Sequence, residues 1–431
     1  LFNKIPYFDE NVEISQYPDI PNNEFTRDEI LSMLAKEMLD AAEQLPASQP
    51  EVGRIHKYIA LAYAAKIKLY QAYQQDEITH AVTSINKELL REVVSLCDQV
   101  TASNRYGLLD DFQGLDLVTN ENGKESVFAI QYSMNDGTES AGRINWSNLL
   151  NSPGGGSPYG GDGFFLPSQD LINAYQTDAN GLPDFNYQSK SDYSWAVLNN
   201  GVYTLQNTTP NVDPRLDFVV GRPTITWKTY PDKPCEGWVR DKDTYGYNCA
   251  KRFWVSPESS DMFNGWPWGA SQLNWQIIRY ADILLWKAEA LIELNEGNGL
   301  ETARDLINQI RNRARNSAYV KDFNDHSKYA ANYLVNPYPA DVWNQDYARQ
   351  ALRWETRLEK ALEGERFFDL VRWGIVETTM NKYITAESDN RIYYANAHFT
   401  GGKDEYYPVP NNQYGFSGGK YVQNPGYAPF N

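Results

Sequence analysis

The chain has few of the residues that zinc sites and disulfide frameworks require. Its 431 residues include only 3 cysteines and 4 histidines, and their spacing matches neither a zinc-ligand pattern nor the HExxH motif. Three cysteines in a chain of this length also exclude a disulfide-stabilised framework. Cys97 lies on the apolar face of a helical run, where a buried thiol is expected.

Long apolar runs and an excess of positive charge are missing as well. No stretch approaches the roughly 18 to 20 uncharged apolar residues that a bilayer crossing needs. Lysine and arginine number 39 against 56 aspartates and glutamates, so the net charge is −17. Because such a chain repels phosphate backbones and anionic headgroups, we expect no nucleic-acid partner.

Aromatic side chains, by contrast, are abundant. The chain has 30 Tyr, 12 Trp and 17 Phe. Indole and phenol rings have an apolar face and a polar atom, so they stack on flat ligands and hydrogen-bond at the rim. The same rings also fill loop-heavy folds. Composition alone leaves both interpretations open.

Apolar residues recur at helical spacing near both ends of the chain. Residues 26–45 show this period behind Thr26 and Glu29, which have the spacing of a capping box. Residues 54–73 and 85–100 continue it, so three consecutive antiparallel helices are expected. Further helices are predicted over residues 275–294, 300–315, 345–362 and 365–376. Their pairing around short glycine-bearing turns, such as that at Gly364, favours tetratricopeptide-like hairpins without a strict 34-residue period.

The middle of the chain, residues 106–274, lacks helical period. Gly and Pro cluster there, and the short β-like bursts SVFAIQYS and LDFVVGRPTITW lie between turn signals. Loops of this kind commonly carry binding surfaces. We therefore expect a mostly α fold in which helical hairpins support a loop-rich, irregular region with a few short strands.

Acidic residues cluster most regularly near residue 360, which raises the question of catalysis. A glycosidase needs two carboxylates across a cleft, but here opposite charges alternate at helical spacing, which favours a salt-bridge lattice. The residues concerned are Glu355, Glu359, Glu363, Glu365 and Asp369, interleaved with Arg353, Arg357, Arg366 and Arg372. We expect these groups to maintain the fold, and Arg366→Ala to lower stability without selectively removing binding.

Nine tryptophans divide by position. Trp286, Trp354 and Trp373 lie within helical periods and are expected at helix interfaces. Six others lie in the irregular middle, among Gly, Pro, Asn and Asp, where each either fills a loop or faces solvent; we expect at least two to be exposed. These six are Trp195, Trp227, Trp238, Trp254, Trp266 and Trp268. An exposed indole stacks on the apolar face of a sugar ring while polar neighbours bond its hydroxyls.

Several segments occur in a characteristic order. They are DPRLDFVVGRP (213–223), IRYADILLWKAEAL (278–291) followed by ARDLINQIRNRA, RLEKALEGERFFDLVRWG (357–374), and the closing YYPVPNNQ and QNPGY. Together they resemble the SusD/RagB family of surface glycan-binding lipoproteins, over residues 21–427. The resemblance implies a largely helical fold with tetratricopeptide-like hairpins and no enzymatic activity.

The resemblance also implies a biological setting. It suggests nutrient uptake at the extracellular face of the outer membrane, with a SusC-like TonB-dependent transporter as partner. We expect one SusD-like unit over residues 1–431 that is N-terminally incomplete, with a lipid anchor upstream. Within it we expect helical hairpins over 21–105, a ligand-binding loop region over 106–274, tetratricopeptide-like helices over 275–376 and a C-terminal loop region over 377–431.

Ligand residues are predicted from the residues themselves, because family members place their stacking aromatics in variable loops. The candidates are Trp238, Tyr245, Tyr247, Trp254, Trp266 and Trp268 for stacking, and Arg240, Asn248 and Lys251 for polar contacts. Cys235 and Cys249 bracket part of this segment, and a disulfide between them would clip the loop in an oxidising compartment. No cofactor is expected, while a structural calcium ion in the Asp- and Gly-rich loops stays open.

Three functions remain to be separated. Capture of an oligosaccharide without catalysis is the leading hypothesis. A RagB-like peptide receptor on the same scaffold predicts a deep groove and binding that is insensitive to loss of the indoles. A glycoside hydrolase predicts release of reducing ends from polysaccharide.

Overall fold

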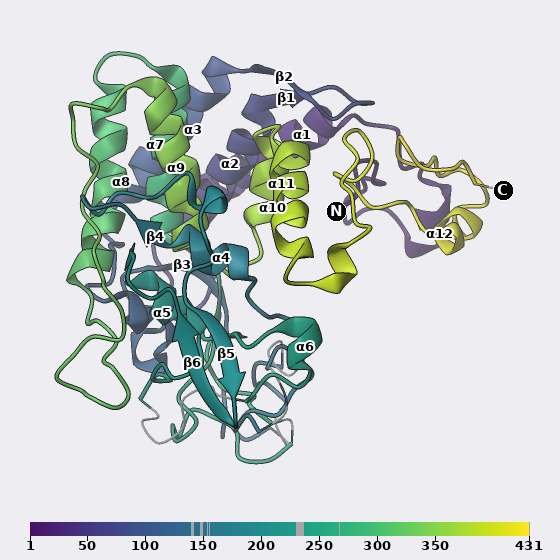
Figure 1. The fold of residues 1–431 in the computed structure, drawn as a ribbon. Helices are drawn as coiled ribbons and strands as arrows, with labels where there is room; N and C mark the ends of the chain where they lie inside the picture. Colours follow the sequence, from purple (N-terminus) through teal and green to yellow (C-terminus); the bar gives the residue numbers. More distant parts are fainter. Residues whose placement is uncertain are drawn as a thin grey trace.

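Helices gather on one side of the molecule and loops on the other (Figure 1). The structure is a computed structural model that describes residues 1–138, 142–146, 150–152, 154, 156–229, 237–266 and 268–430. The α-helices are α1 (Arg27–Gln44), α2 (Lys57–Ala72), α3 (Lys87–Ala102), α4 (Gln169–Ala174), α5 (Arg215–Val219), α6 (Lys242–Tyr245), α7 (Tyr280–Leu294), α8 (Gly299–Asn316), α9 (Gln345–Glu359), α10 (Arg366–Arg372), α11 (Val376–Ser388) and α12 (Asn411–Phe416). Among the described residues, no helix is both long and apolar enough to cross a membrane.

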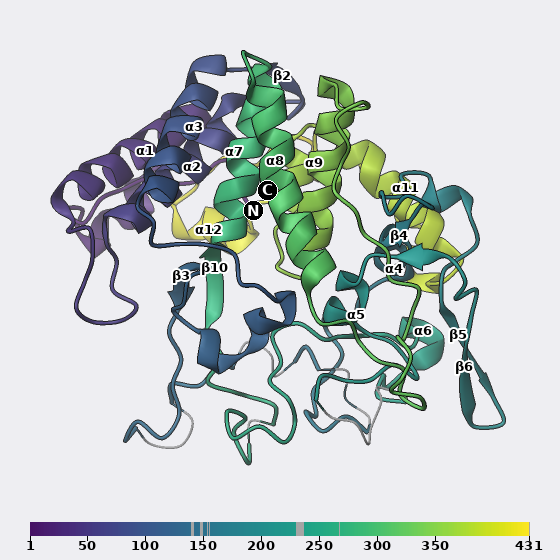
Figure 2. The same ribbon diagram turned by 90° about the vertical axis from the view of Figure 1, so that its left-hand side faces the viewer.

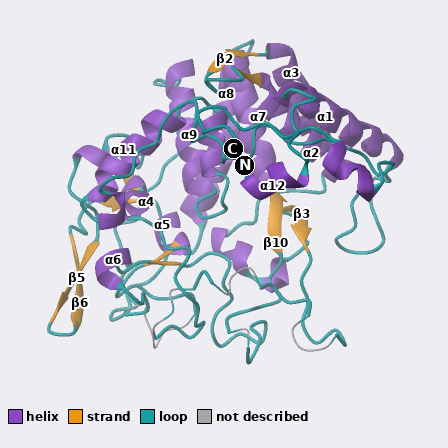
Figure 3. Cartoon of the chain, turned by 90° about the vertical axis from the view of Figure 1, so that its right-hand side faces the viewer, coloured by secondary structure: helices purple, strands orange, loops and turns teal. Residues whose placement is uncertain are grey.

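The strands are short and pair two by two, each pair antiparallel. The pairs are β1 (Tyr73–Gln75) with β2 (Val82–Ile85), β3 (Ser126–Ile130) with β10 (Trp275–Arg279), β4 (Gln176–Thr177) with β7 (Asn211–Val212), β5 (Trp195–Asn199) with β6 (Val202–Gln206), and β8 (Val220–Gly221) with β9 (Cys249–Ala250). In Figure 3, β3, β10, β5 and β6 lie below the helices, whereas β2 lies at the top of the view. The expected mostly α architecture with a few short strands is thus confirmed.

The predicted N-terminal helices form as expected. Thr26 caps α1, its side chain accepting from the backbone N–H of Glu29 while the Glu29 carboxylate accepts from the N–H of Thr26. The alanines of α2 are buried and let α1 and α3 pack closely on either side. Helix α3 in turn packs against α7, and α7 against α8 and α9 (Figure 2).

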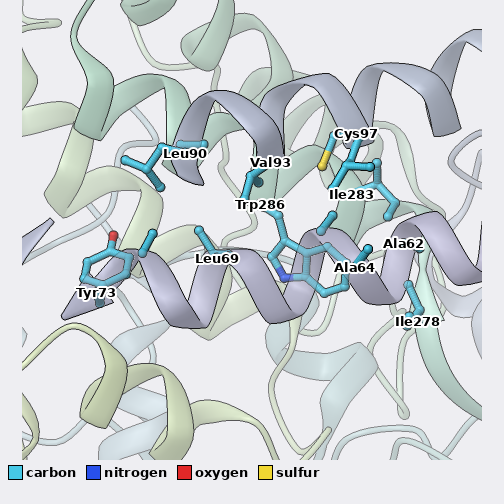
Figure 4. Close-up of a cluster of buried hydrophobic side chains, with 14 of the residues drawn as sticks. Ala62, Ala64, Leu69, Tyr73, Leu90, Val93, Cys97, Ile278, Ile283 and Trp286 are labelled. Atoms are coloured by element: carbon cyan, nitrogen blue, oxygen red, sulfur yellow. The ribbon is translucent and has the colours of Figure 1, made fainter. Parts of the chain in front are cut away.

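The largest hydrophobic core lies between α2, α3 and α7. Leu69 of α2, Val93 of α3 and Trp286 of α7 belong to it (Figure 4). Trp373, after α10, is buried in the same core, and Trp354 of α9 packs against a second one. Cys97 is fully buried in the largest core, and desolvation raises the pKa of its thiol to about 12. The predicted interface positions of the helical tryptophans and the buried thiol are confirmed.

Three predicted elements are wrong in part. The helix expected from residue 275 begins only at Tyr280, because residues 275–279 pair with β3 as strand β10. The β-like burst LDFVVGRPTITW instead contributes helix α5, which gives way to the two-residue strand β8. The region expected as C-terminal loop, residues 377–431, contains most of α11 and all of α12. By contrast SVFAIQYS forms β3 as predicted.

Candidate functional site

The acidic cluster near residue 360 forms buried ion pairs. Arg215 Nη1 lies 2.6 Å from Glu355 Oε1, and Arg279 Nη1 lies 3.0 Å from Glu359 Oε1. All four side chains are buried. Burial alone would raise the pKa of Glu359, but the neighbouring cations Arg313, Arg279 and Arg215 lower it to about 2. A carboxylate held in this way stays ionised and hydrogen-bonded, so it serves structure rather than acid–base chemistry.

Asp369 pairs with the interleaved Arg372 at 2.8 Å, but the partners of Glu355 and Glu359 are not the interleaved arginines that the sequence suggested. The cations come from other segments: Arg215 from α5, Arg279 from β10, and Arg311 and Arg313 from α8. Arg357 pairs instead with Asp170 of α4 at 2.6 Å. The lattice therefore joins α5, α8, α9 and β10, and it positions the loop-rich region under the helices.

Beneath the loops, an aromatic cluster fills the interior. Tyr159, Trp227, Trp238 and Trp254 pack together, and the ring centroids of Trp227 and Trp238 are 4.9 Å apart. The indole of Trp227 donates to the hydroxyl of Tyr159 at 2.9 Å, and that hydroxyl donates to the carbonyl of Val255 at 2.7 Å. Trp238 and Trp254 are only 3% and 2% exposed. Their prediction as stacking residues is corrected: they hold the loops together.

Two predicted polar contacts are also internal. The ammonium group of Lys251 donates to the carbonyls of Asp217 at 2.7 Å and Thr226 at 2.8 Å. Lys251 and Asn248 are both buried. Neither side chain is placed to bond a ligand at the surface, because both are buried. This part of the prediction is corrected as well.

Three of the six tryptophans considered in the irregular middle are exposed. Trp266 and Trp268 are 66% and 53% exposed, and Trp195 on β5 is 44% exposed. The expectation that at least two of the six are exposed is confirmed. Gly160 lies against Trp268, since a Cβ at that glycine would be 3.3 Å from the Trp268 Cβ. The loop around residue 160 thus packs against Trp268.

Arg240 connects that loop to the next segment. Its Nη1 lies 2.9 Å from Asp162 Oδ1, and its Nη2 donates to the carbonyl of Gly161 at 2.8 Å. Both side chains are solvent-exposed, so the pair offers charged donors and acceptors on the loop against which Trp268 lies. Exposed pairs contribute little to stability and can exchange partners when a ligand arrives.

Two predicted tyrosines follow Arg240 in the chain. Tyr245, at the end of α6, is exposed and lies 6.1 Å from the ring of Tyr393. Tyr247 is partly exposed and packs edge-on against Tyr203 of β6 at 5.5 Å. Gly246 between them, at φ +77°, lets the guanidinium of Arg391 approach its Cα closely. A Cβ at this glycine would require the guanidinium of Arg391 to move.

We call this set of exposed and partly exposed rings and polar groups the loop face. Its residues are Asp162, Tyr203, Arg240, Tyr245, Tyr247, Trp266, Trp268, Arg391 and Tyr393. Tyr203, Arg391 and Tyr393 were missed by the sequence reasoning, as was the exposed Trp146. Arg391 and Tyr393 follow α11, far along the chain from the other members, and no local pattern links them to the middle segment.

Two points of the sequence analysis concern the Cys235–Cys249 disulfide and a structural metal ion. Cys235 is outside the described residues, so its pairing with Cys249 remains a prediction. Among the described residues, no group of three or more His, Cys, Asp or Glu side chains is arranged to hold a metal ion.

Comparison with known proteins gives one family. The model of the SusD family matches residues 124–427. No curated protein matches the chain.

Solved structures with a similar fold come from several Bacteroides species. A SusD-like protein from Bacteroides fragilis is 22% identical, with a TM-score of 0.63, and the match covers 99% of this chain and 76% of that one. A SusD superfamily protein from Bacteroides vulgatus is 21% identical, with a TM-score of 0.65 and coverage of 99% and 74%. Surface glycan-binding protein A from Bacteroides thetaiotaomicron, in complex with laminarihexaose, is 16% identical, with a TM-score of 0.60 and coverage of 98% and 74%.

Proposed function

Since this chain belongs to the SusD family, we propose that it is a non-catalytic glycan-binding protein of the cell surface. The protein captures an oligosaccharide and delivers this ligand to a SusC-like TonB-dependent transporter at the outer membrane. A lipid anchor holds the protein at the membrane. The resemblance to a surface glycan-binding protein in complex with laminarihexaose supports the class of ligand.

The observation that carries the proposal is the exposure of Trp266 and Trp268, the second of which lies against the loop that holds the exposed Arg240–Asp162 pair. Large exposed indoles cost solvation free energy, and on a surface they point to a partner. A sugar ring presents an apolar face to the indole and hydroxyls to the neighbouring charged groups. Each stacked ring contributes about 1 kcal/mol, so affinity for a single sugar unit is modest and rises when several linked units bind together.

A binding screen with matched variants tests this proposal. Intrinsic fluorescence of the chain is followed against a panel of neutral plant, host and microbial oligosaccharides. The Trp266→Ala/Trp268→Ala variant is compared with Tyr407→Ala, which removes another strongly exposed ring outside the loop face. We expect saturable binding to one glycan, weakened at least about tenfold in the double variant and unchanged in the Tyr407 variant.

The rival functions appear as other outcomes of the same screen. Binding of mixed peptides that survives loss of both indoles would favour a peptide receptor. Release of reducing ends from polysaccharide would contradict the absence of catalysis. Glu355 and Glu359 are buried in ion pairs with Arg215 and Arg279, which supports the non-catalytic assignment.

A further inference from the structure

A recess lined by none of the loop-face residues lies beside α2. It is a hollow of about 490 Å³ between the loop joining α1 to α2, the segment after α3, and strand β3. Figure 3 shows the α1–α2 loop hanging beside β3. The volume of the hollow is within the range of small-molecule sites. We call it the α1–α2 hollow.

The charge of this hollow is opposite to that of the chain. Its lining includes three cations, Arg54, Arg105 and Lys124, against one carboxylate, Glu51, whereas the whole chain carries −17. Arg54 pairs with Glu51 at 3.0 Å, and Lys124 with Asp110 at 2.9 Å, outside the lining. Both pairs are solvent-exposed and therefore weak, so these cations can turn to an anionic ligand.

The amino end of α2 adds to this potential. His56 is the N-cap residue of this 16-residue helix, and its side chain makes no capping hydrogen bond. The positive end of the helix dipole therefore lies at the wall of the hollow, where it favours negative charge.

The imidazole of His56 is itself an unusual group. It borders the hollow and is only 8% exposed. Its Nε2 lies 3.3 Å from the hydroxyl of Tyr106, while its Nδ1 has no hydrogen-bond partner among the described residues. Burial, and then the nearby Arg105, lower the pKa of His56 and so favour the neutral ring. A buried polar atom without a partner is rare and needs an explanation.

The remaining lining suits a ring with hydroxyls better than a bare ion. Tyr106 and Phe128 provide aromatic surface, and the side-chain amides of Asn122 and Gln131 provide a polar wall. These two amides bond each other at 2.9 and 3.0 Å, which fixes their orientation. We propose that the α1–α2 hollow binds a uronic acid unit, its carboxylate held by Arg105 and Lys124. This inference rests on the proposed function for its choice of sugar as the ligand class.

Calorimetric titration of the full chain tests the inference. The probes are glucuronate and galacturonate, with glucose, galactose and acetate as comparisons. We expect saturable binding of one uronate, with weaker or no binding of the neutral hexoses and of acetate. In Arg105→Gln/Lys124→Gln the affinity for the uronate should fall at least about tenfold, because two charge-assisted contacts are lost.

Two further variants separate this site from other effects. Lys36→Gln/Lys382→Gln removes the same charge from exposed positions elsewhere and should leave uronate affinity unchanged. Trp266→Ala/Trp268→Ala should also leave it unchanged, while weakening any neutral glycan. The inference is overturned if neither uronate binds, if acetate or the hexoses bind equally well, or if the Arg105/Lys124 variant binds like the unaltered chain or like the Lys36/Lys382 variant. Uronate binding without any neutral-glycan response would contradict the proposed glycan binding by the loop face, and would leave the inference about the α1–α2 hollow intact.

Discussion

Arg279, the last residue of β10, donates from Nη1 to Oε1 of Glu359 in α9 at 3.0 Å, with both side chains buried. The two residues are 80 positions apart in the chain. Their contact joins β10, which follows the loop-rich region in the chain, to helix α9. Glu359 also accepts from Arg215 and Arg313, so one carboxylate serves three guanidinium groups.

Replacing this carboxylate should be costly. In Glu359→Gln the charge is lost while three cations stay buried, and breaking a buried ion pair in this way costs about 3–5 kcal/mol. Urea unfolding followed by circular dichroism measures the loss. Glu43→Gln, at an exposed position, is the control and should change the free energy of unfolding by less than about 0.5 kcal/mol. Equal stability of the two variants would contradict a structural role.

The same residue makes stability depend on acid. Arg313, Arg279 and Arg215 outweigh burial and lower the pKa of Glu359 to about 2, whereas in the unfolded chain it lies near 4.5. Between these values the unfolded state binds more protons, so this stabilisation is present above pH 4.5 and is lost as pH falls towards 2. The gap in urea midpoint between the unaltered chain and Glu359→Gln should therefore shrink as pH falls. A gap that stays constant down to pH 2.5 would argue against this ionisation.

Two arginines of α10 should differ in importance. Arg372 pairs with Glu289 and, at 2.8 Å, with Asp369. Among the described residues no carboxylate lies within ion-pairing distance of Arg366, and burial followed by the nearby Arg357 lowers its pKa to about 9. Arg372→Ala should cost about 3–5 kcal/mol and Arg366→Ala about 1 kcal/mol, mainly from packing. Thermal unfolding of the pair checks this order, and glycan affinity of the folded Arg366 variant should be unchanged.

Glu387 gives the opposite pH dependence. Burial raises its pKa to about 7, although the carboxylate accepts from the backbone N–H of Asp170. Because the folded state holds this proton more tightly than the unfolded state, stability should fall as pH rises from about 4.5 through 7. Glu387→Gln removes the ionisation, so its melting temperature relative to the unaltered chain should be higher at pH 8 than at pH 5. The exposed Glu43→Gln variant should show the same difference at both pH values.

The tryptophans of the middle segment should separate into two groups. Trp254→Ala removes a buried indole from the cluster with Tyr159 and Trp238, and such truncations cost about 3–5 kcal/mol. Trp266→Ala and Trp268→Ala remove exposed rings and should change stability by less than about 0.5 kcal/mol. Differential scanning calorimetry of the three variants measures the contrast. A large loss in either exposed variant would place that indole in the core.

Long periodic segments were predictable from the sequence. Thr26 and Glu29 mark the start of α1, and the alanines of α2 indicate a close helix neighbour, since these signals depend on residues a few positions apart. The helix expected from residue 275 was wrong because residues 275–279 find their hydrogen-bond partners in β3, about 150 positions earlier. Local apolar spacing cannot reveal such a pairing.

The candidate site was predictable in region but not in detail. Trp238 and Trp268 have similar neighbours in sequence, yet the first is buried and the second exposed. The difference arises because Tyr159 and Trp227, from other segments, pack around Trp238. The charges near residue 360 were correctly expected to support the fold, but their partners Arg215, Arg279 and Arg313 come from three distant segments.

The aromatic cluster of Tyr159, Trp227, Trp238 and Trp254 has a consequence for engineering. It anchors the segments that carry the loop face without using Trp266, Trp268 or Tyr245. The rings that face solvent can therefore be exchanged while the anchor is left untouched. Libraries randomised at these three exposed positions should retain a high fraction of folded members and vary in ligand preference, which makes this scaffold suitable for selecting new carbohydrate binders.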